Sequence, residues 1–219
     1  MKKREIYFPL KEPYKADYNN YGANPQFYSA HPEYQIDAHN GVDAIALNPR
    51  SPVFGLAEFP VYAVYDQKII KAERDPNGGW IVEAISNEKF LDKFGVAYYW
   101  KDTYYHLAEN KLFVKVGQNV MIGDLVAMGN ASGWSPNNMI TPHLHYHTKP
   151  GDLNDKQEFI KAFPNNKKRG AVDPEDYWIK KPNGKYISAF EIRSSLTAIA
   201  EALKKIAELV ADLIKRRKQ

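Results

Sequence analysis

The sequence predicts a mainly β protein: a small antiparallel β-sheet domain followed by a C-terminal amphipathic α-helix. From about residue 42 to residue 129, short β-branched or aromatic runs alternate with turn formers. No helical period separates these runs, as it would in a βαβ fold. Roughly the last thirty residues have apolar positions at spacings of three and four, which is typical of a helix.

The chain divides into three segments on this interpretation. Residues 1–24 are rich in Pro, Tyr and Asn without clear periodicity, and we expect an extended lead-in there. Residues 25–184 are expected to form the β domain, with a polar, loop-rich closing part from residue 152. The predicted strands are VDAIAL, PVYAVYD, KIIKAE, GWIVEAI, VAYYW, KLFVKVG and DLVAMG. The DPNGG sequence at residues 75–79 predicts a tight turn between KIIKAE and GWIVEAI.

The third segment, residues 188–219, is expected to form the helix. Neither Gly nor Pro occurs after Gly184, and Ala fills several positions, both of which favour a helix. Leu209 and Ile214 widen its apolar stripe beyond a narrow coiled-coil seam, which favours docking or membrane contact over a simple dimer. The stripe itself follows a heptad pattern and consists of Leu196, Ile199, Leu203, Ile206, Val210 and Leu213.

Three roles for this stripe stay open. It could dock on the β domain of its own chain, form a homo-oligomer, or contact an anionic membrane or lipopolysaccharide. Parallel self-association with Leu at the first heptad position and Ile at the second favours trimers or tetramers. Lys204, Lys205 and the basic tail at residues 215–218 would serve membrane contact. We expect the full chain to self-associate or to bind membrane.

Composition limits the chemistry. The chain of 219 residues contains no cysteine, so a metal site must use His and carboxylate ligands. The net charge of +4 is modest and indicates an ordinary surface rather than a nucleic-acid-binding one. The opening MKKREIYFPLKEPYK has no apolar run behind its basic residues, so no signal peptide is expected there. No segment has an apolar run long enough to span a membrane.

The arrangement of the six histidines indicates a metal site. In TPHLHYHT the residues alternate as in a strand, so His143, His145 and His147 should share one face. One imidazole there could bind a metal while another reaches a substrate beside it. His39 and Asp43 lie in AHNGVDAIA, where Gly41 indicates a turn entering a strand. A His and a carboxylate joined by one distant His give a three-ligand zinc site with an open position, which is the catalytic pattern.

Five separated segments of the sequence resemble the lysostaphin-type (LytM-like) metallopeptidase family. In chain order they are HNGVD, PVYAVYDQKI, YYHL, VKVGQNVMIGDLVAMGNASG and PHLHYH, spanning about residues 36–147. They correspond to the family's His-x-x-x-Asp motif, PVxA strand, Tyr-x-His-Leu stretch, Gly-punctuated run and His-Leu-His motif. The resemblance is specific because all five occur in the family's order.

The resemblance implies that His39, Asp43 and His145 bind Zn²⁺, and that His106 and His143 form the catalytic pair. It implies a groove over the sheet, for which Tyr34, Tyr105, Trp134 and His147 are weaker candidates. Such a zinc site lowers the pKa of water toward about 7 and polarises a peptide carbonyl. One imidazole would assist deprotonation of the water, and the other would stabilise the oxyanion or protonate the leaving amine. Which histidine does which stays open.

The family's substrates are peptide bonds in the stems and bridges of bacterial peptidoglycan, so we expect action at the cell wall or periplasm. A phage lysin, cytosolic before release, and a trimmed secreted bacterial enzyme both suit a chain without a signal peptide. The alternatives are an inactive scaffold of the same fold that activates a wall amidase, and a structural component of a virion.

Three departures from the family pattern bear on specificity. Extra residues in NPRSPVFGLAE precede Pro60, and GWSPNNMIT before Pro142 is longer than the usual connection. His147 stands where the family often has Glu or Gln. We expect the two insertions to alter the walls of the groove.

Overall fold

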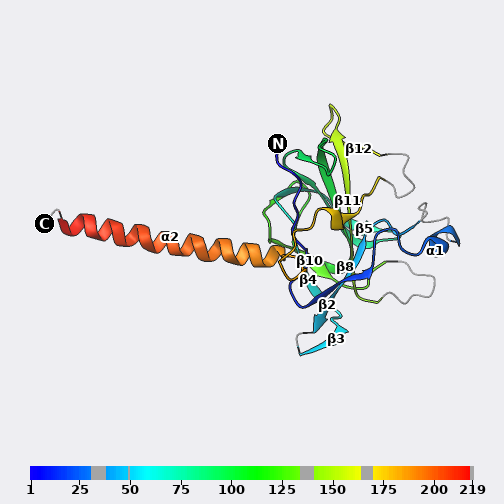
Figure 1. The fold of residues 1–219 in the computed structure, drawn as a ribbon, viewed down its shortest axis with the longest axis horizontal. Coiled ribbons are helices and arrows are strands. Elements are labelled where there is room, and N and C mark those ends of the chain that lie inside the picture. The colour runs from blue at the N-terminus through cyan, green and yellow to red at the C-terminus, as the bar shows by residue number, and fades with distance from the viewer. Residues whose placement is uncertain (31–37, 49, 134–140, 164–169, 218–219) are drawn as a thin grey trace.

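The computed structural model describes residues 1–30, 38–48, 50–133, 141–163 and 170–217. Within these ranges the β domain holds one sheet in which every strand pair is antiparallel, and the C-terminal helix projects away from it (Figure 1). The expected fold class, mainly β with a C-terminal helix, is confirmed. No helix among the described residues is long and apolar enough to cross a membrane.

The central part of the sheet has the strand order β1-β2-β11-β8-β6-β5-β9, and the remaining strands pair at its sides. The strands are β1 (Tyr14–Asn19), β2 (Val42–Asn48), β3 (Ser51–Gly55), β4 (Phe59–Tyr62), β5 (Gln67–Asp75), β6 (Gly79–Ser86), β7 (Phe90–Leu91), β8 (Ala97–Leu112), β9 (Asn119–Val120), β10 (Leu125–Gly129), β11 (Leu144–Leu153) and β12 (Phe159–Lys161). The helices are α1 (Pro25–Ala30), the 3-10 turn η2 (Pro174–Asp176) and α2 (Ala189–Arg217).

Most of the predicted strands form where the β-branched and aromatic runs occur, and the DPNGG turn joins β5 to β6 as expected. Asp75 closes this turn, because its carboxylate accepts hydrogen bonds from the backbone N–H groups of Asn77 and Gly78 at 2.9 and 2.7 Å. The extra residues before Pro60 form strand β3, which pairs with β2.

The strand predicted at KLFVKVG forms only over Lys111 and Leu112, the last two residues of β8. Strand β8 ends at Leu112, and the chain then turns so that β9 can pair with β5. Gly117 has a φ of 87° in this turn, a value that glycine adopts without strain. Val114 is buried although it lies outside a strand, whereas Phe113 and Val116 are 51% and 64% exposed, so the apolar character of the run does not come from strand pairing.

The first 24 residues are more than a lead-in. Ile6, Phe8 and Leu10 are fully buried, and short bridges join this segment to Trp178 and Ser188 near the other end of the domain. Their alternation along an extended backbone places them on one side, facing the core. Residues 1–24 therefore belong to the β domain.

The apolar stripe of helix α2 is exposed to solvent. Leu196, Leu203 and Ile206 are 49%, 60% and 56% exposed, and the helix runs away from the sheet (Figure 1). The side chain of Leu213 lies outside the described residues. Docking of the described part of the stripe on its own β domain, one of the three roles left open by the sequence, is thus contradicted.

Candidate metal centre

Two paired strands bring Asp43 and His145 together. In the register of β2 and β11, His145 lies directly opposite Asp43, so both side chains leave the same face of the sheet. His39 lies three residues before the start of β2. Its backbone is held by Ala23, whose carbonyl accepts from the His39 N–H at 2.9 Å, and by Gly22, whose N–H donates to the His39 carbonyl at 2.7 Å.

The three side chains present one donor atom each to a common point. Nε2 of His39 lies 2.9 Å from Nδ1 of His145 and 3.2 Å from Oδ1 of Asp43. Nδ1 of His145 lies 3.0 Å from Oδ1 of Asp43. All three residues are buried. Tetrahedral zinc with bonds of about 2.0–2.1 Å places its ligands roughly 3.3 Å apart. Two imidazole nitrogens and a carboxylate oxygen at this spacing therefore fit a zinc ion after a small outward adjustment.

A contact outside the cluster orients His39. Its Nδ1 lies 3.1 Å from the carbonyl oxygen of Asn20, which can only accept, so Nδ1 carries the proton. Nε2 then keeps its lone pair for a metal. The contact with Asn20 also fixes the orientation of the ring, as a hydrogen bond from the other ring nitrogen usually does for histidines that bind metals. Because Asn20 directly follows β1, the N-terminal segment takes part in building the site.

Gly41 allows the two strands to approach. A Cβ atom at this position would lie 2.5 Å from the carbonyl oxygen of Tyr146 and 2.9 Å from the ring of His145. Neither group can move away easily, because the carbonyl belongs to the backbone of β11 and the ring belongs to the group of three possible metal ligands. The glycine of the HNGVD segment is thus required by packing against His145.

The surroundings shift the pKa values of two of the three donor residues, Asp43 and His145. Burial alone would raise the pKa of the Asp43 carboxyl, but its hydrogen bonds with His145 and His39 outweigh burial and hold the pKa well below its usual value. Burial lowers the pKa of His145 to about 4, although its hydrogen bond to Asp43 acts in the opposite direction. At neutral pH Asp43 is therefore ionised and His145 is neutral, the states in which both can bind a metal.

His106 lies within β8 at a backbone conformation that is rare for histidine. Its φ is 59°, in the left-handed region, and the strain is held by hydrogen bonds on both sides. The His106 N–H donates to the carbonyl of Gly78 at 3.0 Å, and its own carbonyl accepts from the N–H of Asn130 at 2.8 Å. The ring Nδ1 lies 2.6 Å from the carbonyl oxygen of Ser132 and so carries the proton.

His143 lies just before β11, one residue outside the strand that the sequence predicted for it. Its Nδ1 lies 2.6 Å from the carbonyl oxygen of Thr141, so the proton again lies on Nδ1. Its Nε2 lies 3.5 Å from Oδ1 of Asp43. The ring centroids of His143 and His106 are 4.6 Å apart, so the two imidazoles lie side by side next to the three possible metal ligands.

Burial, together with the nearby rings of His143 and His145, lowers the pKa of His106 to about 3. His106 is therefore neutral at physiological pH. With Nδ1–H engaged by Ser132, the remaining Nε2 is an acceptor that can take a proton or a hydrogen bond. The arrangement provides an oriented neutral imidazole, not a fixed positive charge.

The four weaker groove candidates fare differently. Tyr105 lies opposite His145 in the register of β8 and β11, and its ring is 5.1 Å from the ring of His145, so it lies beside the centre. His147 is fully buried, and its ring packs against that of Tyr105 at 5.0 Å between ring centroids, so its place in a groove stays a prediction. Tyr34 and Trp134 lie outside the described residues. The groove itself, whose walls include parts of the chain that are not described, stays an expectation.

Sequence reasoning missed the carbonyl groups that orient the rings. Asn20, Ser132 and Thr141 act through their backbone oxygen atoms, which every residue possesses. No residue type could therefore have marked them. Only the position of Ser132 in the GNASG run, a predicted turn near the end of a strand, offered a local signal.

No model of a known protein family matches the chain, and no curated protein matches it. Among solved structures, it is similar to the catalytic domain of the antimicrobial peptidase lysostaphin from Staphylococcus simulans, with 25% identity, 74% of this chain and 90% of that chain covered, and a TM-score of 0.47. It is also similar to the catalytic domain of the prophage-encoded M23 protein EnpA from Enterococcus faecalis, with 21% identity, 78% and 95% covered, and a TM-score of 0.47.

A third similarity is to a chain of the SpoIIQ–SpoIIIAH pore-forming complex, with 16% identity, 80% of this chain and 90% of that chain covered, and a TM-score of 0.50. At this identity the similarity is one of fold alone. The lysostaphin-type fold indicated by the sequence is confirmed by the structure itself, because the five motif segments contribute strands to one antiparallel sheet and their histidines meet at one centre.

Proposed function

We propose that this chain is a zinc-dependent endopeptidase that hydrolyses peptide bonds in the stem peptides or cross-bridges of bacterial peptidoglycan. The observation that carries this proposal is the joint placement of two groups of side chains. His39, Asp43 and His145 converge on one point with donor atoms 2.9–3.2 Å apart, and the rings of His106 and His143 lie side by side next to them.

The three converging residues fit zinc rather than a hard cation, because two of the three donors are imidazole nitrogens. They leave a coordination position open, as catalytic zinc sites do. When bound, zinc would supply a Lewis acid that polarises a peptide carbonyl and acidifies water.

The two remaining histidines supply proton transfer and charge stabilisation. In both rings Nδ1–H is held by a backbone carbonyl, at Ser132 for His106 and at Thr141 for His143. Each ring can therefore exchange a proton only at Nε2, and its orientation is fixed before substrate arrives. One Nε2 would take the proton of the attacking water. The other ring would hold the developing oxyanion or protonate the leaving amine only in its cationic form, with a second proton on Nε2 taken from solvent or from the first ring.

The choice of peptidoglycan rests on the resemblance of the five motif segments to lysostaphin-type peptidases. The site would then act at the bacterial cell wall. Hydrolysis of a peptide bond leaves one new amino group and one new carboxyl group, and both can be identified in the products.

The decisive experiment is digestion of purified sacculi, followed by mass spectrometry of the released fragments. We expect new amino and carboxyl ends within stem peptides or bridges for the native chain, and far fewer of them in the same time for His106→Ala. Glu109→Ala is the matched control, because Glu109 is exposed and shares β8 with His106. A native chain that binds zinc yet releases no fragments from any type of sacculus would contradict the proposal. A chain without zinc affinity or activity would instead support the inactive scaffold.

A further inference from the structure

The proposed function makes no use of helix α2, although this helix carries many of the exposed large apolar side chains of the described chain. Leu209 is 66% exposed and Ile199 is 57% exposed. These side chains lie on a helix of 29 residues that leaves the β domain and continues into solvent (Figure 1). A face of this size requires a partner if it is not to promote non-specific association.

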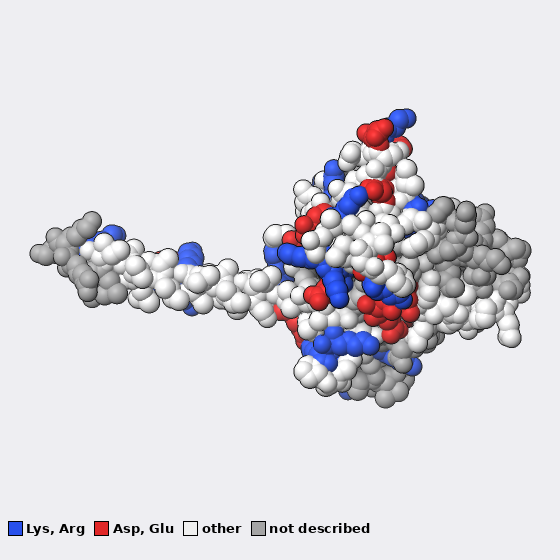
Figure 2. All heavy atoms as spheres, turned by 45° about the horizontal axis from the view of Figure 1, so that its top comes forward, with Lys and Arg blue, Asp and Glu red and all other residues white. Residues whose placement is uncertain are grey.

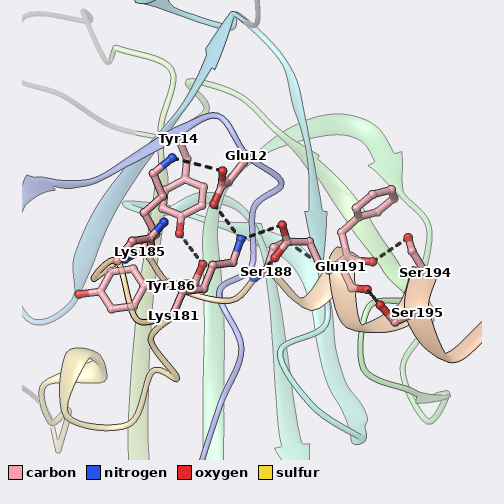
Figure 3. Close-up of polar contacts among 11 residues, drawn as sticks. Glu12, Tyr14, Lys181, Lys185, Tyr186, Ser188, Glu191, Ser194 and Ser195 are labelled. Carbon is pink, nitrogen blue, oxygen red and sulfur yellow. Dashed lines mark hydrogen bonds and ion pairs between the residues drawn. The ribbon is translucent and has the colours of Figure 1, made fainter.

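The direction of α2 is fixed at its base by a capping box. The Oγ of Ser188 accepts from the N–H of Phe190 at 3.2 Å, and the N–H of Ser188 donates to Oε2 of Glu191 at 3.3 Å (Figure 3). Lys181 bridges Glu191 to Glu12 at 3.0 and 3.1 Å, which connects the first turn of the helix to the N-terminal segment (Figure 3).

Two further contacts hold the same turn against the domain. Ala189 is fully buried, and Arg193 pairs with Asp124 at 3.3 Å. The ring of Phe190 packs against Tyr62 at 5.2 Å between centroids. Because the base is held from several sides, the stripe cannot turn back onto the sheet, and its partner must come from outside the chain.

The heptad positions of the helix describe that partner. With Leu196 at position a, every residue at positions a, d, e and g from 195 to 214 is uncharged. These twelve positions are Ser195, Leu196, Ile199, Ala200, Ala202, Leu203, Ile206, Ala207, Leu209, Val210, Leu213 and Ile214. In a two-helix coiled coil positions e and g flank the seam and usually carry charges. Uncharged e and g positions indicate that each helix has neighbours on both sides.

The polar face argues against a membrane as the partner. Between residues 195 and 215 the charged residues fall at positions b, c and f, and three acidic residues balance three basic ones, while three further basic residues, Arg216, Arg217 and Lys218, follow at the end of the chain. The acidic residues are Glu201, Glu208 and Asp212, and the basic residues are Lys204, Lys205 and Lys215. A helix that lies on anionic lipid carries mainly Lys and Arg on this face. Figure 2 shows that the visible side of α2, up to its grey end, is largely free of charged groups apart from a few Lys or Arg side chains in blue.

We propose that α2 assembles with the α2 helices of further copies of this chain into a parallel bundle of three or four. Leu at position a with Ile at position d favours these numbers in parallel bundles. The face is roughly 30 Å long and offers roughly 500 Å² per helix on a cylinder about 10 Å wide. Three such faces total roughly 1,500 Å², close to the area of about 1,600 Å² that a standard stable interface buries.

Light scattering and sedimentation of the full chain test this assembly over a wide range of concentration. We expect the mass of three or four chains for the native protein and of one chain for Leu203→Glu. The matched pair is Ala207→Glu at position e and Ala198→Glu at position c, which introduce the same residue at exposed sites. Ala207→Glu should abolish assembly, and Ala198→Glu should leave the mass unchanged.

The absence of cysteine in the chain provides a test of orientation. Leu196→Cys introduces one thiol near the base of the helix, and oxidation should link copies in a parallel bundle. In an antiparallel one the thiols would be roughly 30 Å apart. A native chain that stays monomeric, a dimer insensitive to Ala207→Glu, or a Leu196→Cys assembly that does not cross-link would each overturn the proposal. So would a monomer that binds vesicles containing phosphatidylglycerol and loses this binding in Leu203→Glu.

Discussion

Nδ1 of His106 lies 2.6 Å from the carbonyl oxygen of Ser132, and this contact holds the ring in the one tautomer whose Nε2 can accept a proton. The backbone of His106 is simultaneously held at a φ of 59° by the strands on both sides. A histidine in this conformation, with its ring fixed beside His143, is typical of a residue whose position matters for chemistry.

The first prediction concerns these two histidines. His106→Ala and His143→Ala should keep their zinc, because neither ring belongs to the three-donor cluster, but should lose most of their turnover. Loss of one general acid–base partner typically reduces the rate roughly 100-fold to 10,000-fold. Zinc content by elemental analysis and the initial rate of release of sacculus fragments measure the two effects separately. Near-native rates in both variants would rule out the catalytic pair.

The second prediction concerns His145. His145→Ala removes one of three donors, so we expect strong loss of zinc by elemental analysis. Zinc that binds the folded chain also stabilises it. A chelator should therefore lower the melting temperature of the native chain and leave that of His145→Ala unchanged. Equal zinc content in the variant and the native chain would refute the ligand assignment.

The third prediction concerns the close approach of Gly41 to β11. Gly41→Ala places a Cβ 2.5 Å from the carbonyl oxygen of Tyr146 and 2.9 Å from the ring of His145, so the strands must separate. We expect weaker zinc binding in equilibrium dialysis together with a lower melting temperature. Gly95→Ala is the matched control, because Gly95 has a φ of 84° but nothing within 4 Å of the added atom. This control should be destabilised by backbone strain while keeping native zinc affinity.

The fourth prediction concerns a buried ion pair in the N-terminal segment. Arg4 donates to Asp102 at 2.8 Å and to Oγ1 of Thr148 at 2.9 Å, and both charged residues are almost entirely buried. Arg4→Ala leaves the carboxylate of Asp102 without its cation, which typically costs about 3–5 kcal/mol. Urea unfolding should show this loss, whereas the exposed Lys2→Ala should unfold as the native chain does. A small effect in Arg4→Ala would mean that residues 1–24 are dispensable to the core.

Much of the fold and the site could be predicted because the relevant signals are local. Alternating apolar residues marked β2, β5 and β6, and the spacing of HNGVD and PHLHYH marked the histidines. The role of residues 1–24 could not be predicted, because the buried Arg4 has its partners, Asp102 and Thr148, far along the chain. The strand predicted at KLFVKVG ends early because Phe113, Val114 and Val116 give a strand-like composition outside any strand, and of these Val114 is buried while the other two are exposed. The exposure of α2 was equally invisible, since an apolar stripe looks the same whether it docks on its own chain or on a copy.

The last prediction concerns His147, which shares a face with His145 but lies beneath the centre. The ring is fully buried, and neither Nδ1 nor Nε2 has a hydrogen-bond partner among the residues that the structure describes. An unpaired buried polar group is unfavourable by about 1–3 kcal/mol. His147→Leu, which fills a similar volume without polar atoms, should therefore raise the free energy of unfolding. His147→Gln keeps buried polar atoms and should give no such gain.

Because of the same ring, we also expect the free energy of unfolding to depend on pH. Burial, with the nearby charge of Lys149, holds the pKa of His147 well below its usual value of about 6.5, so the folded ring stays neutral while the unfolded ring takes up a proton below that pH. The unfolded state then binds more protons, and stability falls as the pH falls, by up to roughly 1.4 kcal/mol per unit for this one group. The advantage of His147→Leu over the native chain should accordingly widen between pH 7 and pH 5, as measured by urea unfolding of the zinc-free proteins. A gap that stays constant across this range would show that His147 is protonated, or exposed to water, in the folded chain.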